Sequence, residues 1–77
     1  MTVNNINKNE LKTLIRETRR LAGLTQLELA TRAGVGKTLV FNLEKGSEKV
    51  SLENLFKVLR ILNIKIEYKL PFNVSDQ

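Results

Sequence analysis

Glycine divides most of this sequence into short segments. The chain has four glycines, Gly23, Gly34, Gly36 and Gly46, and the helical periodicity of its apolar residues breaks off at three of them, Gly23, Gly34 and Gly46. Glycine ends helices readily because it adopts the left-handed backbone conformation without steric cost. With 77 residues, the chain has room for one small domain with a thin core. We therefore expect several short helices separated by tight turns.

The composition excludes several kinds of protein. The chain has no Cys, which excludes disulfide bonds and thiolate metal sites, and no His, which removes the commonest general base. The sequence also contains no glycine-rich phosphate loop and no acidic cluster that could support catalysis. No apolar run exceeds three residues, so we expect no membrane span and no signal-peptide core. We therefore expect a protein that is not an enzyme and needs no metal or small-molecule cofactor.

The charge balance favours a polyanionic partner. Thirteen Lys and Arg residues against eight Asp and Glu residues give a net charge of +5 and a pI near 9.9. A small basic domain is attracted to nucleic acid first and to anionic membranes second. The sequence has no polybasic tail of the kind that binds nucleic acid without structure. The charge therefore points to a folded nucleic-acid-binding domain.

The first helix is expected to start after Asn9. Asn is a favoured N-cap, and Glu10 follows in the first turn, where the helix dipole favours an acidic side chain. The helix ends at Gly23. Its inward residues recur at spacings of three and four and are Leu11, Leu14, Ile15, Thr18, Leu21 and Ala22.

Two shorter helices follow, joined by a turn that contains glycine. Thr25 and Glu28 form a capping box at the start of the second helix, which Gly34 closes. The third helix runs from Lys37 to Lys45, and Gly36 gives it only a weak N-cap. The inward residues of this pair are Leu29, Ala30, Ala33, Val40 and Leu43. Two short helices with such a turn match the geometry of a helix-turn-helix.

A fourth helix and a strand complete the expected elements. Ser51 caps the helix and Asn63 ends it, and its apolar stripe is Leu52, Leu55, Phe56, Leu59 and Leu62. Residues 64–70 then alternate between apolar and charged side chains until Pro71, which predicts a strand with one buried face. The expected divisions are a flexible arm (1–8), a helix-turn-helix domain (9–63), the strand (64–70) and a loose tail (71–77).

The predicted strand has no evident partner in its own chain. A lone strand leaves backbone groups unpaired along both edges, and residues 2–6 are too short and too rich in Asn to be a convincing mate. The simplest partner is the same segment of a second copy, antiparallel across a two-fold axis. The homodimer interface would then contain Ile64, Ile66, Tyr68 and Leu70. The alternatives are a fifth helix or a disordered tail.

The motifs of the helical region resemble those of the Xre/Cro-type helix-turn-helix regulators. The matching residues within 11–62 are Leu24-Thr25-Gln26, Leu29-Ala30, Gly34-Val35 and Leu43-Glu44 before Gly46. HipB-type antitoxins are a closer likeness, because the T-Q-x-E-L-A motif from Thr25, the apolar Leu39, and the S-L-x-x-L-x-x-V-L motif from Ser51 are all present.

This resemblance implies a fold, a function and partners. The fold would be all-α, lambda-repressor-like, with four to five short helices and a C-terminal strand that pairs across a homodimer. The protein would be a repressor that binds inverted-repeat operators in double-stranded DNA and autoregulates its operon. Its further partner would be a HipA-like kinase toxin, with no membrane involved, in the bacterial cytoplasm at the nucleoid. The alternatives are a module that mainly binds and neutralises a toxin, and a phage-type repressor with no toxin.

The same resemblance assigns roles to individual residues. In this fold the second helix lies across the phosphate backbone and the third enters the major groove. Gln26 matches a phosphate-binding glutamine of the family, and Arg19 and Glu44 match a structural ion pair. With Val40 and Leu43 inward, the expected base readers are Lys37, Thr38, Phe41 and Asn42, although Phe41 could instead pack between the helices. The expected phosphate contacts are Thr25, Gln26, Arg32, Lys45 and Lys49.

Overall fold

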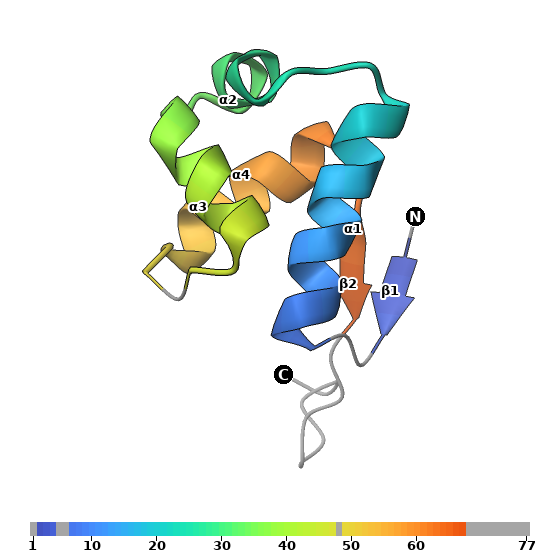
Figure 1. Cartoon of the computed structure of the whole chain (residues 1–77). Coiled ribbons are helices and arrows are strands. Elements are labelled where there is room, and N and C mark those ends of the chain that lie inside the picture. The colour runs from blue at the N-terminus through green and yellow to red at the C-terminus, as the bar shows by residue number, and fades with distance from the viewer. Residues whose placement is uncertain (1, 5–6, 48, 68–77) are drawn as a thin grey trace, which may run out of the picture.

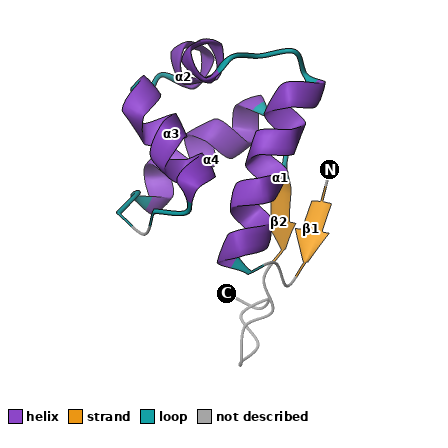
Figure 2. Cartoon of the chain, in the orientation of Figure 1, coloured by secondary structure: helices purple, strands orange, loops and turns teal. Residues whose placement is uncertain are grey.

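The computed structural model describes residues 2–4, 7–47 and 49–67. This part of the chain forms the helices α1 (Lys8–Leu21), α2 (Gln26–Ala33), α3 (Lys37–Lys45) and α4 (Leu52–Ile61), with the short strands β1 (Thr2–Asn4) and β2 (Lys65–Glu67). The four helices make an all-helical helix-turn-helix fold, in which α2 and α3 are joined by a short turn (Figure 1). In Figure 2 the two strands lie together on one side of α1, and α3 lies on the other side.

The core lies where the four helices meet. Each helix contributes one large, fully buried side chain, and these are Ile15, Leu29, Val40 and Val58. Leu24, Ala30, Leu43, Leu59, Leu62 and Ile64 complete the buried cluster. Burying one such side chain contributes on the order of 1.5–3 kcal/mol, so these residues supply most of the driving force for folding. The predicted inward positions of α2 and α3 are confirmed, except that Ala33 is only half-buried.

The predicted boundaries of α2 and α3 are confirmed by their caps. The hydroxyl of Thr25 accepts a hydrogen bond from the Glu28 backbone N–H, and the Glu28 carboxylate accepts one from the Thr25 N–H, which is the predicted capping box. Gly34 and Gly46 end the helices in the left-handed conformation, with φ of +73° and +92°. Gly36 precedes α3 without any side-chain cap, as expected.

The start of α1 differs from the prediction. Asn7, not Asn9, is the N-cap: its side-chain oxygen accepts from the Glu10 backbone N–H at 2.9 Å, and its amide donates to the Glu10 carboxylate at 2.7 Å. The helix therefore starts at Lys8, and Asn9 lies inside its first turn. The reason is that the Asn7–Glu10 spacing satisfies two polar groups at once, which Asn9 cannot do with Glu10 beside it.

Two predicted apolar stripes are partly wrong. Leu21 is 88% exposed, because α1 ends there and the chain turns at Gly23 to bury Leu24 in its place. In α4, Leu52 and Phe56 are also exposed. The side of α4 that faces the core instead carries Leu55, Val58, Leu59 and Leu62. A helix with apolar residues around more than half of its surface leaves its rotation to be set by its neighbours.

Part of the segment that was expected to be a flexible arm forms a strand. Thr2–Asn4 forms β1 and pairs in parallel with β2, with Thr2 opposite Lys65 and Asn4 opposite Glu67. A strand therefore forms within the predicted segment 64–70, but it has a partner in its own chain. Ladder hydrogen bonds come from the backbone and form wherever two extended segments meet, so the low strand propensity of the Asn-rich segment does not prevent the pairing.

Candidate functional site

An ion pair holds α1 against α3. The Arg19 Nε donates to Glu44 at 2.6 Å and its Nη2 donates to the other carboxylate oxygen at 3.0 Å, while Nη1 donates to the Leu24 carbonyl at 2.8 Å. The hydrogen bond with Glu44 raises the pKa of Arg19 above its ordinary value. All three nitrogens of the guanidinium thus donate within the protein. The structure contains the predicted ion pair, and this pair fixes the orientation of α3 relative to α1.

Gln26 lies at the N-terminus of α2 and contacts the same carboxylate. Its amide Nε2 donates to the Glu44 Oε1 at 3.3 Å, and the side chain is half-buried. An amide nitrogen carries two N–H donors, so a second donor remains for an external acceptor. Next to it, Thr25 is exposed, and its hydroxyl oxygen caps α2. These two polar groups lie beside the free backbone N–H groups of a helix N-terminus, which favours an anion at this position.

The outer face of α3 presents the four predicted base-reading residues to solvent. Lys37, Thr38 and Phe41 are exposed and Asn42 is half-buried, whereas Val40 and Leu43 point into the core. Spacings of one, three and four residues place these four side chains on one side of the helix. Phe41 is 49% exposed, so it is not part of the core between the helices. The face combines hydrogen-bond donors and acceptors with one aromatic ring.

The predicted phosphate contacts do not all gather in one place. Lys45 lies in the last turn of α3, with its ammonium 5.8 Å from the centre of the Phe41 ring. Lys49 is exposed in the loop before α4. Arg32 is also exposed, but it lies in the last turn of α2, at the other end of that helix from Gln26. The structure therefore gathers Gln26 and Lys45 on the α1 side of α3, and leaves Arg32 apart from them.

Sequence reasoning missed the contribution of α1 to this surface. A cavity of about 370 Å³ lies between α1, the start of α2 and the outer side of α3, and it is lined by Arg16, Arg19, Arg20, Gln26, Phe41, Glu44 and Lys45. Arg16 and Arg20 were not predicted as site residues. The available signal was that Arg16 and Arg20 are four residues apart and flank Arg19, which places all three at neighbouring positions of one helix.

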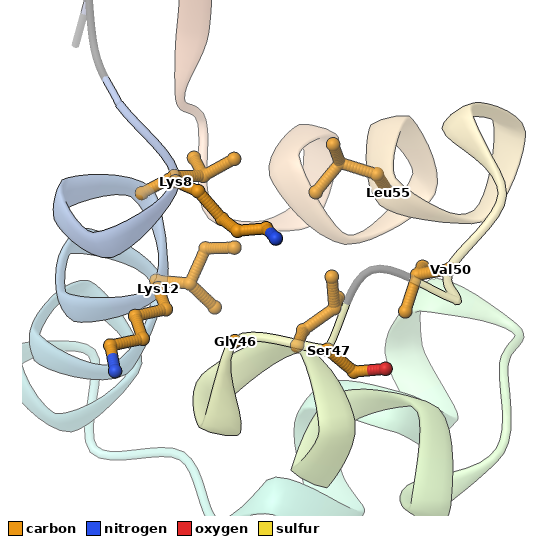
Figure 3. A pocket seen from close by; sticks show the side chains of 9 residues that line it. Lys8, Lys12, Gly46, Ser47, Val50 and Leu55 are labelled. Carbon is orange, nitrogen blue, oxygen red and sulfur yellow. The ribbon is translucent and has the colours of Figure 1, made fainter.

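Another cavity, of about 320 Å³, lies near the start of α1 and is largely apolar. Figure 3 shows the Lys8 side chain reaching from α1 toward Ser47 and Leu55. Lys12 packs against Gly46, where an added Cβ would lie 3.1 Å from the Lys12 Cδ; that flexible side chain can shift by a few tenths of an ångström, so the positive φ is the main reason for glycine here. None of the predicted DNA-contacting residues lines this cavity.

The predicted dimer residues are only partly described. Ile64 is 5% exposed and belongs to the core of its own chain. The Ile66 backbone lies in β2, while Tyr68 and Leu70 lie outside the described residues. Ile64 therefore packs against the helices of its own chain, which agrees with the predicted buried face of the strand.

The described residues offer neither a metal-binding cluster nor a membrane-spanning helix. They contain no group of three or more His, Cys, Asp or Glu side chains placed to hold a metal ion. None of the four helices combines the length and the apolar character that a membrane crossing needs.

Comparisons with known proteins agree on one family. The helix-turn-helix family profile HTH_3 matches residues 15–69. An uncharacterized HTH-type transcriptional regulator from Archaeoglobus fulgidus is 42% identical over 57 residues, which are 74% of this chain and 81% of that protein. The restriction-modification controller protein C.AhdI from Aeromonas hydrophila superimposes with a TM-score of 0.67 at 33% identity, over 75% of this chain and 88% of its own.

A chain of the HipA–HipB–O2–O3 complex superimposes over more of the molecule. Its TM-score is 0.74 at 24% identity, and the match covers 87% of this chain and 94% of that chain. At this identity the likeness shows a shared fold.

Proposed function

Because this chain belongs to the Xre-type helix-turn-helix family of transcriptional regulators, we propose that it is a repressor that binds an inverted-repeat DNA operator as a homodimer. The observation that carries the proposal is the outer face of α3, where Lys37, Thr38, Phe41 and Asn42 are not used by the core. A helix of this size fits the major groove, where base edges are distinguishable. The protein would act in the predicted bacterial cytoplasm at the nucleoid, where its operator lies.

In this proposal Lys37 and Asn42 read bases. A lysine can donate to the O6 and N7 atoms of guanine, and an asparagine can pair bidentately with adenine. Thr38 and Phe41 can contact thymine methyl groups. Thr25, Gln26, Arg32, Lys45 and Lys49 bind phosphates and set the position of α3 without reading sequence.

The strands support the homodimer proposal with one change, which is that β2 has a partner in its own chain on one edge. β1 covers one edge of β2, and among the described residues no strand pairs with the other edge. An open edge is a template for another strand. The strand of a second copy, antiparallel across a two-fold axis, would extend the sheet there, with Ile66, Tyr68 and Leu70 in the contact. Analytical ultracentrifugation of the full chain tests this, and a monomer at micromolar concentration would exclude it.

The experiment that tests DNA recognition is selection of bound duplexes from a random library by the full chain. We expect an inverted repeat whose half-sites are separated by about one helical turn (~34 Å) or a multiple of it. Lys37→Ala and Asn42→Ala should change the preferred bases, while Gln26→Ala should weaken binding to all sequences alike. If both reader variants select the same motif as the wild type, the reader assignment is wrong.

A narrower form of the proposal is an antitoxin that also binds a HipA-like kinase. Its support is limited to the motif resemblance and to the shared fold with HipB. The alternative of a module that mainly holds a partner is favoured by one observation, the exposure of Leu27 on α2, which is 57%. Co-expression with the product of the neighbouring gene, followed by co-purification, tests both. Full operator affinity without a co-purifying protein would favour a repressor that has no toxin.

A further inference from the structure

The cavity between α1 and α3 carries a strong positive charge. Its lining contains four cations, Arg16, Arg19, Arg20 and Lys45, and one carboxylate, Glu44. Arg19 already binds both oxygens of that carboxylate, so their charges compensate each other. The charges of Arg16, Arg20 and Lys45 remain available to an external group. Three cations around one small cavity repel one another unless an anion lies between them.

The described residues offer these cations little internal compensation. Arg20 and Lys45 have no ion pair among the described residues, and Arg16 has only a 3.9 Å contact with Glu17, both of whose side chains are about half exposed, at 45% and 53%. Arg16 and Arg20 lie one helical turn apart, where like charges slightly destabilise a helix. Arg20 also lies in the last turn of α1, where a cation interacts favourably with the helix dipole, so the two effects roughly offset each other.

The neighbours of the cavity indicate which anion fits. The Gln26 side chain lines the cavity from the N-terminus of α2, and Phe41 lines it from the outer face of α3. Lys45 is held near this opening by its contact with the Phe41 ring. The cavity is thus continuous with the surface assigned to DNA, at the side where the phosphate backbone would pass when α3 occupies the groove.

We propose that the α1–α3 cavity binds a backbone phosphate of the operator, with Arg16 and Arg20 of α1 as its main ligands together with Lys45 and Gln26. The proposal rests on the DNA-binding function and deepens it, since it adds α1 to the elements that contact DNA. It also assigns the cavity to one oxyanion of the duplex rather than to a base, because the charged groups that line it, once Glu44 is paired, are all cationic donors.

The test measures the affinity of the full chain for a fluorescent duplex of mixed sequence across a series of KCl concentrations. The variants are Arg16→Gln, Arg20→Gln and the double variant. Arg60→Gln is the matched control, because Arg60 is an exposed arginine of α4 outside the cavity. We expect each cavity variant to bind roughly three- to tenfold more weakly. Each should make the negative slope of log K against log salt shallower by about 0.9.

The control should change affinity by less than about twofold, and the thermal midpoint of Arg20→Gln should stay close to that of the wild type. If the cavity variants match Arg60→Gln in affinity and slope, the proposal is overturned while DNA binding itself stands. If the wild type binds no duplex at low salt, the function proposed above fails as well. A selective change in base preference caused by Arg16→Gln or Arg20→Gln would also overturn a phosphate role.

Discussion

Arg19 and Glu44 join the first and third helices through a bidentate ion pair with N–O distances of 2.6 and 3.0 Å. Their side chains are only 11% and 5% exposed, so the pair is mostly shielded from water. Gln26 donates to the same carboxylate. One contact thus connects the helix that carries the arginines, the helix that is expected to bind phosphate, and the helix that is expected to read bases.

Removing the carboxylate of this pair should destabilise the fold. Glu44→Gln leaves the Arg19 guanidinium shielded and without an opposing charge, and we expect the free energy of unfolding to fall by about 2–4 kcal/mol. The shift of the urea midpoint at constant m-value measures this loss. Glu53→Gln is the control, because its carboxylate is 82% exposed and lies 3.9 Å from Lys57, and it should change stability by less than ~0.5 kcal/mol. Equal losses in the two variants would contradict a structural role for the pair.

The capping box of α2 should make stability depend on pH in the acid range. Hydrogen bonds from the Thr25 backbone and hydroxyl hold the pKa of Glu28 below its ordinary value. A lowered pKa in the folded state stabilises the fold above the unfolded value, about 4.3, and this contribution is lost as the pH falls through the lower folded value.

Urea titrations of wild type and Glu28→Gln at several pH values below about 5 test this effect. The variant should lose stability less steeply with acid than the wild type. Glu17→Gln, on the exposed face of α1, serves for comparison and should follow the wild type. Parallel curves for wild type and Glu28→Gln would argue against the capping box as the cause.

A better cap should stabilise α3. Gly36 is the N-cap with φ of −78° and ψ of 152°, which any residue can adopt, and an added Cβ would meet no atom within 4 Å. Gly36→Ser supplies the missing side-chain acceptor, and we expect a gain of a few tenths of a kcal/mol, or roughly 1–4 °C in Tm. Differential scanning calorimetry measures the shift. Gly34→Ala, at a φ of +73°, should instead lower Tm, and a lower Tm for Gly36→Ser would show that the site is strained.

Ile64 should stabilise the single chain as well as any dimer. It is 5% exposed within its own protomer, so Ile64→Ala should cost about 2–4 kcal/mol at every protein concentration. Ile61→Ala, at a site 38% exposed, should cost less than ~1.5 kcal/mol. Thermal unfolding at about 1 and about 100 µM separates the two roles, because a contact made only between subunits gives a concentration-dependent loss. If the loss of stability in Ile64→Ala disappears at the higher concentration, Ile64 contributes only to the dimer interface.

Most helix ends, with the start of α1 as the exception, proved readable from the amino-acid order, because each depends on atoms within one turn of the chain. Thr25 with Glu28, Ser51 before α4, and the left-handed Gly34, Gly46 and Asn63 all behave as their local chemistry indicates. The sequence also predicted that Val40 and Leu43 point inward, and the remaining residues of α3 then had to form its outer face. The family motifs lie within this same region, so the sequence alone predicts the helix-turn-helix.

Features that join distant parts of the chain could not be read in this way. Thr2 pairs with Lys65, and Arg16 and Arg20 share a cavity with Lys45, because of where the helices direct the backbone. The exposure of Leu21 and Phe56 likewise depends on how far each helix is rotated by its neighbours. A single sequence records which residues are apolar, charged or able to cap, but contacts between segments follow from packing of the whole chain, which no local pattern contains.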